Sequence, residues 1–282
     1  MSPAPYAGAR VALLTQHGKE RVIAPVLEEA LSCTVVHVTG YDTDLLGTFT
    51  RETPRSGTQF ETAVRKARLG MELAGLPLGV ASEGSFVRDP YVGLLPWNIE
   101  LLVLVDDVRG IEVTGVAQGK ANSAHLLTAD WPTAQTFARE SGFPEHHLVV
   151  RPVGEDDPRV RKGLDSWETY EAAFGWARGL TSTGDVFVEV DLRAHANPTR
   201  MENIRRAADD LVARLLSACP ACDAPGFGVS ERVPGLPCRG CGLPTAQAAS
   251  EIWSCRTCGL SETRGVTGPP HAEPERCGHC NP

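Results

Sequence analysis

The stretches ACPAC (218–222), PCRGC (237–241), SCRTC (254–258) and RCGHC (276–280) decide the fold of the last quarter of this chain. Each contains a C-x2-C pair, and together they hold eight of the nine cysteines. Two residues between paired cysteines let both sulfurs face one point, and four thiolates suit zinc because the ion is borderline soft and accepts tetrahedral ligands. The spacing predicts two structural zinc ions, held by Cys219, Cys222, Cys238, Cys241, Cys255, Cys258, Cys277 and Cys280.

The spacing does not by itself fix which two cysteine pairs share a zinc ion. The gaps between successive pairs are 15, 13 and 18 residues. A sequential arrangement joins the first pair to the second and the third to the fourth, and it closes the shorter loops. Because closing a longer loop costs more chain entropy, we expect sequential pairing, with a crossed arrangement as the alternative.

Length and composition indicate a soluble protein of two domains. A chain of 282 residues can bury one core of roughly 200 residues and still carry a small appended module. The N-terminus, MSPAPYAGARVALL, has no charged and apolar leader, and no apolar run approaches the ~20 residues of a membrane span. Cysteines at metal spacing favour a reducing compartment, so we predict a cytoplasmic protein that does not bind membranes.

The charge balance argues against a nucleic-acid partner. The net charge is −8, with 22 basic and 29 acidic residues before residue 217 and 5 basic and 6 acidic residues from there on. Two sites of four thiolates and one zinc ion each would add further negative charge to the tail. Zinc ribbons of this composition lack the positive surface that releases counterions from nucleic acid, and a protein partner is the better expectation for them.

Apolar runs of strand length alternate with stripes of helical spacing through the first 216 residues. This alternation predicts an α/β fold, and a hairpin turning near 107–110 favours a mixed sheet flanked by helices. We expect an α/β core domain at 1–216 and a zinc-ribbon module at 217–282. The predicted strands are 11–15, 34–38, 78–81, 99–106, 111–117, 147–151 and 185–192, and the main helices are 58–74, 130–142, 165–177 and a long one from 197.

A polar cluster follows the first predicted strand and is the first candidate site. It contains Thr15, His17 and Lys19 in the sequence TQHGKE. Ligands of α/β proteins bind at the carboxyl ends of strands, where a glycine lets backbone N–H groups approach an anion. Lys19 would supply a point charge for a phosphate. The alternative is an ordinary solvated loop.

Residues 58–86 read TQFETAVRKARLGMELAGLPLGVASEGSF. This segment resembles the inosine/xanthosine triphosphate pyrophosphatase (Maf-like) family, whose members carry a T-F-E-E-N-A-L-x-K-A-R helix, then G-L-P, then a short strand ending in D-D-S-G. The loop around Lys19 is similar to the family's T-x-N-x-x-K phosphate loop. The positions in approximate register are Thr58, Glu61, Ala63, Lys66, Ala67, Arg68, Gly75, Leu76, Pro77 and Gly84.

This resemblance implies a catalytic site for polyphosphate. Glu61 and Glu83 would hold magnesium, while Lys19 and Lys66 would contact the triphosphate. Glu61 has a second explanation, because Thr58 and Glu61 have the spacing of a helix capping box.

The segment also departs from the family. Ala81 and Ser82 stand where the family has paired aspartates, and His17 stands where it has asparagine. The later G-F-G-Y-D-P-x-F stretch is absent from the sequence. Kinship of fold is therefore better supported than a shared activity.

A third cluster spans residues 189–200, EVDLRAHANPTR. Strand alternation followed by a helix start brings Arg193, Asn197 and Arg200 together, and two arginines with free helix N–H groups could bind a phosphate or carboxylate. The alternative is an Asn-Pro helix cap with a surface ion pair.

Over nearly its full length the chain also resembles an uncharacterised bacterial family of unknown function with a C-terminal double zinc ribbon. The shared motifs are T-x-H-G-K-E (15–20), S-E-G-S-F (82–86), N-P-T-R-M (197–201) and G-L-P-C-x-x-C-G-L-P (235–244).

The leading functional hypothesis is a metal-dependent hydrolase of a phosphorylated small molecule, most concretely a nucleoside triphosphate pyrophosphatase. Glu83, Glu61, Lys19 and His17 would be catalytic. The other class is a non-enzymatic sensor of a nucleotide-like ligand, with the zinc ribbons as a platform for docking a protein.

Overall fold

The computed structural model describes residues 5–43, 57–90 and 92–282. The chain divides into two compact units. Unit 1 comprises residues 1–108 and 114–212, and unit 2 comprises 109–113 and 213–282. Within the described ranges, every helix is too short or too polar to cross a lipid bilayer.

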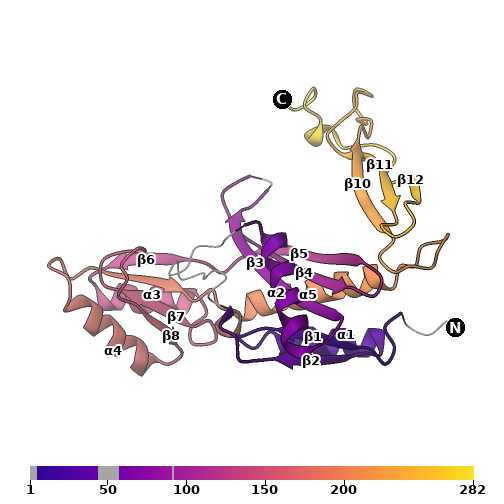
Figure 1. Ribbon diagram of the computed structural model, residues 1–282. Coiled ribbons are helices and arrows are strands. Elements are labelled where there is room, and N and C mark those ends of the chain that lie inside the picture. The colour runs from indigo at the N-terminus through magenta and orange to yellow at the C-terminus, as the bar shows by residue number, and fades with distance from the viewer. Residues whose placement is uncertain (1–4, 44–56, 91) are drawn as a thin grey trace. The chain divides into compact units, whose positions relative to one another are not determined.

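The first half of the chain forms a sheet of five strands (Figure 1). The sheet is mixed, as the sequence predicted. The strand order is β2-β1-β3-β4-β5, with β1 parallel to β2 and β3, and β3 antiparallel to β4. The strands are β1 (Arg10–Leu14), β2 (Thr34–Val38), β3 (Leu78–Arg88), β4 (Pro96–Asp106) and β5 (Ile111–Lys120). The helices associated with this half are α1 (Glu20–Leu31), α2 (Gln59–Ala74) and α5 (Pro198–Leu215).

Strand β3 is longer than the predicted run of 78–81. It pairs with β4 along its whole length, from Leu78 opposite Asp106 to Arg88 opposite Pro96. The polar and glycine-rich SEGS sequence concealed the strand, because its stability comes from pairing with the apolar β4 rather than from β propensity. Its parallel neighbour β1 ends at Leu14, so β3 continues past the carboxyl end of β1.

Helix α2 begins with the predicted capping box. The Thr58 side chain accepts the Glu61 backbone N–H, and the Glu61 carboxylate accepts the Thr58 backbone N–H. Gly75 ends the helix with φ +62°, a left-handed conformation that favours glycine. Ala67 and Met71 pack on the sheet. This packing fixes the height of α2 over β3, and with it the position of Lys66.

Unit 1 contains a second, antiparallel sheet, of which the sequence predicted two strands, at 147–151 and 185–192, but not the separate sheet itself. Its order is β6-β9-β7-β8, from β6 (His125–Thr128), β7 (Leu148–Arg151), β8 (Arg161–Leu164) and β9 (Val186–Val190). The sequences of β6 and β8, HLLT and RKGL, are short and carry no period-2 signal. They become strands only because β7 and β9 provide edges to pair with.

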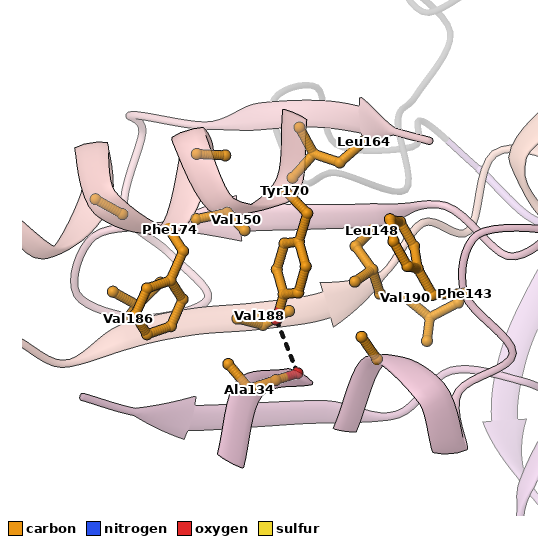
Figure 2. Close-up of a cluster of buried hydrophobic side chains, with 13 residues drawn as sticks. Ala134, Phe143, Leu148, Val150, Leu164, Tyr170, Phe174, Val186, Val188 and Val190 are labelled. Carbon is orange, nitrogen blue, oxygen red and sulfur yellow. Dashed lines mark hydrogen bonds between the residues drawn. The ribbon is translucent and has the colours of Figure 1, made fainter. Parts of the chain in front are cut away.

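Helices α3 (Trp131–Glu140) and α4 (Trp167–Arg178) enclose an apolar cluster on this sheet (Figure 2). Tyr170 lies in its centre, fully buried, and its hydroxyl donates a hydrogen bond of 3.1 Å to the Ala134 carbonyl. Burial raises the pKa of Tyr170 above its ordinary value. The remaining side chains are aliphatic or aromatic, so this cluster is a structural core.

Unit 2 contains a small antiparallel sheet of order β10-β11-β12. Its strands are β10 (Gly228–Pro234), β11 (Ala248–Ser254) and β12 (Ser261–Gly265). The four cysteine pairs lie before, between and after these strands.

Candidate functional sites

The eight paired cysteines form two quartets in unit 2. One consists of Cys219, Cys222, Cys255 and Cys258, and the other of Cys238, Cys241, Cys277 and Cys280. Sulfur–sulfur separations of 3.6 and 3.7 Å occur in the first quartet and of 3.8 and 3.7 Å in the second. A tetrahedron with Zn–S bonds of about 2.3 Å has sulfur edges of about 3.8 Å, so both quartets fit zinc.

The expectation of sequential pairing was wrong, because the quartets are crossed. The register of the sheet explains why. Gly228 at the start of β10 lies opposite Ser254 at the end of β11, which brings the first and third cysteine pairs to one end of the hairpin. Pro234 opposite Ala248 places the second pair at the other end, and β12 returns the chain toward it. The strand hydrogen bonds outweigh a loop-length term of only about 0.6 kcal/mol per doubling.

In unit 1, the loop after β1 places Lys19 beyond the carboxyl end of that strand in the five-stranded sheet. His17 and Gly18 both have positive φ, +67° and +72°, and this turn leads into α1 with Lys19 as its N-cap. The Lys19 side chain is buried, with Nζ 3.1 Å from Ser82 Oγ and 3.5 Å from the Ser82 carbonyl oxygen. The structure therefore places the predicted phosphate-loop lysine against a serine of β3.

The electrostatic surroundings of Lys19 lower its pKa from 10.5 to about 7. The largest cause is burial, which disfavours the ammonium form, followed by the positive charges of Arg200 and Lys66. The carboxylates of Glu83 and Glu100 act in the opposite direction. Lys19, at the N-cap of α1, thus interacts with four charged side chains from β3, β4, α2 and α5.

Glu83 faces α2. It forms a buried ion pair with Lys66, and the Gln59 side chain donates to the Glu83 carbonyl at 2.6 Å. The structure therefore brings the predicted residues Lys66 and Glu83 together, but each is the ion-pair partner of the other. A magnesium ion at Glu83 would have to compete with an ammonium group already in contact with the carboxylate.

The opposite face of the same strands carries the second ion pair. Arg200 Nε donates to Glu100 Oε1 at 2.7 Å, and both side chains are almost completely buried. Gly84 leaves the space for this pair, since a Cβ there would lie 2.4 Å from Glu100 Oε1 and 2.6 Å from an Arg200 nitrogen. Asn98 donates to the same carboxylate oxygen at 2.9 Å, while Glu100 Oε2 is buried and has no hydrogen-bond partner among the residues that the structure describes.

The remaining predicted residues of the first loop lie near this cluster. The His17 ring stacks on His195 with centroids 5.1 Å apart, and His147 lies edge-on to His195 at 6.4 Å. Burial lowers the pKa of His195, with Arg193 and His17 adding to the effect. Thr15 is buried, and its carbonyl oxygen lies 3.0 Å from His37 Nε2.

Three other predicted residues have structural partners. Arg193 forms a bidentate pair with buried Asp191, with contacts of 2.5 to 3.1 Å. Asn197 accepts the Arg200 backbone N–H at 3.0 Å as the cap of α5. The hydrogen bonds of the Glu61 carboxylate are to Thr58. These three side chains therefore support the local structure around the cluster.

Ser82, like Glu100, is a member of the cluster that was not predicted from the sequence. It was noticed as a replacement for an aspartate and as the first residue of the S-E-G-S-F motif, but neither observation gave it a role. Its contact with Lys19 joins residues 63 positions apart, so only the tertiary structure could reveal it.

Comparison with protein-family models shows the family to which this chain belongs. The model of a domain of unknown function, DUF6671, matches residues 66–282, and the chain belongs to that family. The match includes Lys66, Ser82, Glu83, Arg200 and both cysteine quartets, whereas Lys19 lies before it. No curated protein matches the chain.

Proposed function

We propose that unit 1 is a hydrolase of a phosphorylated small molecule, with a nucleoside triphosphate as the most specific candidate substrate. The observation that carries this proposal is the convergence of Lys19, Lys66 and Arg200 where β3 passes the end of β1. Ligands of α/β folds bind outside the carboxyl ends of strands, and basic groups there stabilise the charge that develops on a transferring phosphoryl group.

Helix α1 adds a further attraction for anions. It has twelve residues and starts directly after the left-handed turn of His17 and Gly18, so its N-terminal N–H groups lie close to Lys19. The positive end of a helix dipole stabilises phosphate oxygens. The likeness of residues 58–86 to triphosphate pyrophosphatases supports the same substrate class.

Magnesium enters this proposal with the substrate. Magnesium commonly binds through one or two carboxylates together with substrate phosphates, and keeps several waters. Glu83 is the protein carboxylate of the cluster that could share it, after exchange of its Lys66 contact. The metal would neutralise phosphate charge.

A sensor is the second candidate, favoured by one observation. Glu61 and Glu83, the carboxylates expected to hold magnesium, already have partners in Thr58 and Lys66. An anion-binding site without a metal pair suits recognition without hydrolysis. Unit 2, with its two zinc-binding quartets, would then dock a protein that responds to the ligand.

The test is a panel of nucleoside triphosphates, monophosphates and sugar phosphates, with release of phosphate or pyrophosphate measured with and without magnesium. Turnover that is lost in the double variant Lys66→Met/Glu83→Gln supports the hydrolase, because that variant removes the ion pair without leaving one charge buried. Arg68→Ala is the matched control, since Arg68 lies on the same helix in an exposed pair with Asp107. Thermal stabilisation without turnover supports the sensor. If the panel produces neither turnover nor stabilisation, both candidate functions are contradicted.

A further inference from the structure

We propose that Ser82 is the nucleophile of unit 1 and that Lys19 is the general base that activates it. This inference rests on the proposed hydrolase function and specifies its mechanism. It starts from the 3.1 Å contact between Lys19 Nζ and Ser82 Oγ.

The contact has the geometry of an activated serine. A catalytic base must lie within about 2.6 to 3.2 Å of the group that it deprotonates, and serine–lysine pairs are one known form of this arrangement. Both side chains are buried, with 7 % of Lys19 and 5 % of Ser82 exposed. Burial keeps bulk water away from the amine and fixes both groups.

A lysine can act as a base only when it is neutral. Its surroundings bring the pKa of Lys19 to about 7, through burial and then through Arg200 and Lys66. The free amine is therefore accessible near neutral pH. In that form the nitrogen lone pair can accept the Ser82 proton.

The positions of the other charges suit the same role. Successive residues of β3 point to opposite faces of the sheet, so Glu83 turns to Lys66 while Gly84 lies against Glu100 and Arg200. Each carboxylate is held by a cation of its own, and the Lys19 nitrogen is left with Ser82 as its hydrogen-bond partner among the described residues. The cations of the two ion pairs act on Lys19 more strongly than the carboxylates do, so the pairs lower the affinity of Lys19 for a proton.

The reaction balances in two steps. Ser82 Oγ attacks phosphorus with its electron pair, its proton passes to Lys19 Nζ, and the bond from phosphorus to the leaving oxygen breaks. That oxygen takes the electron pair of the broken bond and receives the proton from Lys19. A water then attacks the phosphoryl-serine and gives a proton to Lys19. The bond between phosphorus and Oγ breaks, and Oγ takes that proton back.

Two measurements test this assignment on the full-length protein. The first is labelling by a fluorophosphonate probe, which transfers its phosphorus to an activated serine with loss of fluoride, followed by mass spectrometry to locate the label. The second is turnover of the phosphorylated substrates. We expect a label on Ser82 that disappears in Lys19→Met, and loss of turnover by on the order of 10³-fold in Ser82→Ala and 10²- to 10⁴-fold in Lys19→Met.

Ser85→Ala is the matched control. Ser85 lies on the same strand, but its hydroxyl donates to the Gln59 amide rather than to an amine. We expect this variant to keep the Ser82 label. The pH dependence gives an independent readout: kcat/KM should rise as pH increases through about 7, because the free protein must lose the Lys19 proton.

The outcomes separate this inference from the proposed function. Turnover that persists in a folded Ser82→Ala variant, with no label on Ser82, overturns the nucleophile and leaves the hydrolase standing. A Lys19-dependent label on Ser82 without turnover supports the pair of residues and overturns the substrate class. If Ser82→Ala does not fold, Ser82→Cys is tested instead. The thiol of this variant is alkylated in the presence and absence of Lys19, and a rate that does not depend on Lys19 overturns the assignment.

Discussion

The two candidate sites of this protein are built in opposite ways. The cysteine quartets of unit 2, whose geometry fits zinc, consist of pairs only three residues apart in sequence, so each half of a site is local. The charged cluster of unit 1 takes one or two residues from each of several elements, and its key contact joins Lys19 to Ser82. The first kind of site can be recognised from spacing, and the second needs the folded chain.

The largest expected effect is removal of zinc. Structural zinc contributes about 10 to 16 kcal/mol in comparable peptides, so chelation should unfold the small sheet of unit 2 while the apolar cores of unit 1 persist. Amide hydrogen exchange followed by mass spectrometry would show the loss of protection in 228–265. Equal loss of protection around Tyr170 would contradict a separate stability of the two units.

The crossed arrangement of the cysteines gives a sharper form of this prediction. The double variant Cys222→Ser/Cys258→Ser changes one quartet and should retain one zinc ion per chain. The double variant Cys222→Ser/Cys241→Ser changes both quartets and should retain none. Native mass spectrometry distinguishes the two, and sequential pairing predicts the reverse result.

Breaking the buried ion pair of unit 1 should have the next largest effect. Arg200→Met leaves Glu100 as an uncompensated buried carboxylate and should lower the free energy of unfolding by about 3 to 5 kcal/mol. The double variant Arg200→Met/Glu100→Gln should recover much of that loss, because no charge remains buried. Urea denaturation measures both, and an Arg200→Met variant as stable as the double variant would argue against a buried pair.

Lys19→Met should change how stability depends on pH. The folded-state pKa of Lys19 is about 7 and its ordinary value is 10.5, so the unfolded chain binds more protons between these limits. The stability contributed by Lys19 therefore rises with pH across this window, by up to about 1.4 kcal/mol per pH unit. The difference in unfolding free energy between wild type and Lys19→Met should show this slope, and a flat difference would mean an ordinary lysine.

The smallest effect is expected at the start of α2. Thr58→Ala removes the side chain that accepts the Glu61 backbone N–H and should cost about 1 kcal/mol of stability. Thr58→Ser keeps the acceptor and is the control. Thermal unfolding measures both, and equal melting temperatures for the two variants would show that the cap contributes nothing.

Sequence patterns predicted the elements that depend on neighbouring residues. The capping box of Thr58 and Glu61, the helix end at Gly75 and the mixed character of the first sheet were all confirmed. Only two strands of the second sheet, β7 and β9, were predicted, because strands such as RKGL carry no signal of their own. Their conformation depends on partners that lie far away in the chain.

The sequence by itself determined that eight cysteines are spaced to hold metal ions and that unit 1 is an α/β fold, because spacing and periodicity are properties of adjacent residues. The tertiary structure alone decided which cysteine pairs combine, since the register of β10 on β11 sets the distances between them. It also decided that Lys19 meets Ser82, and that two ion pairs surround this contact. Such a contact depends on how far β3 extends past β1, which is set by pairing across the sheet.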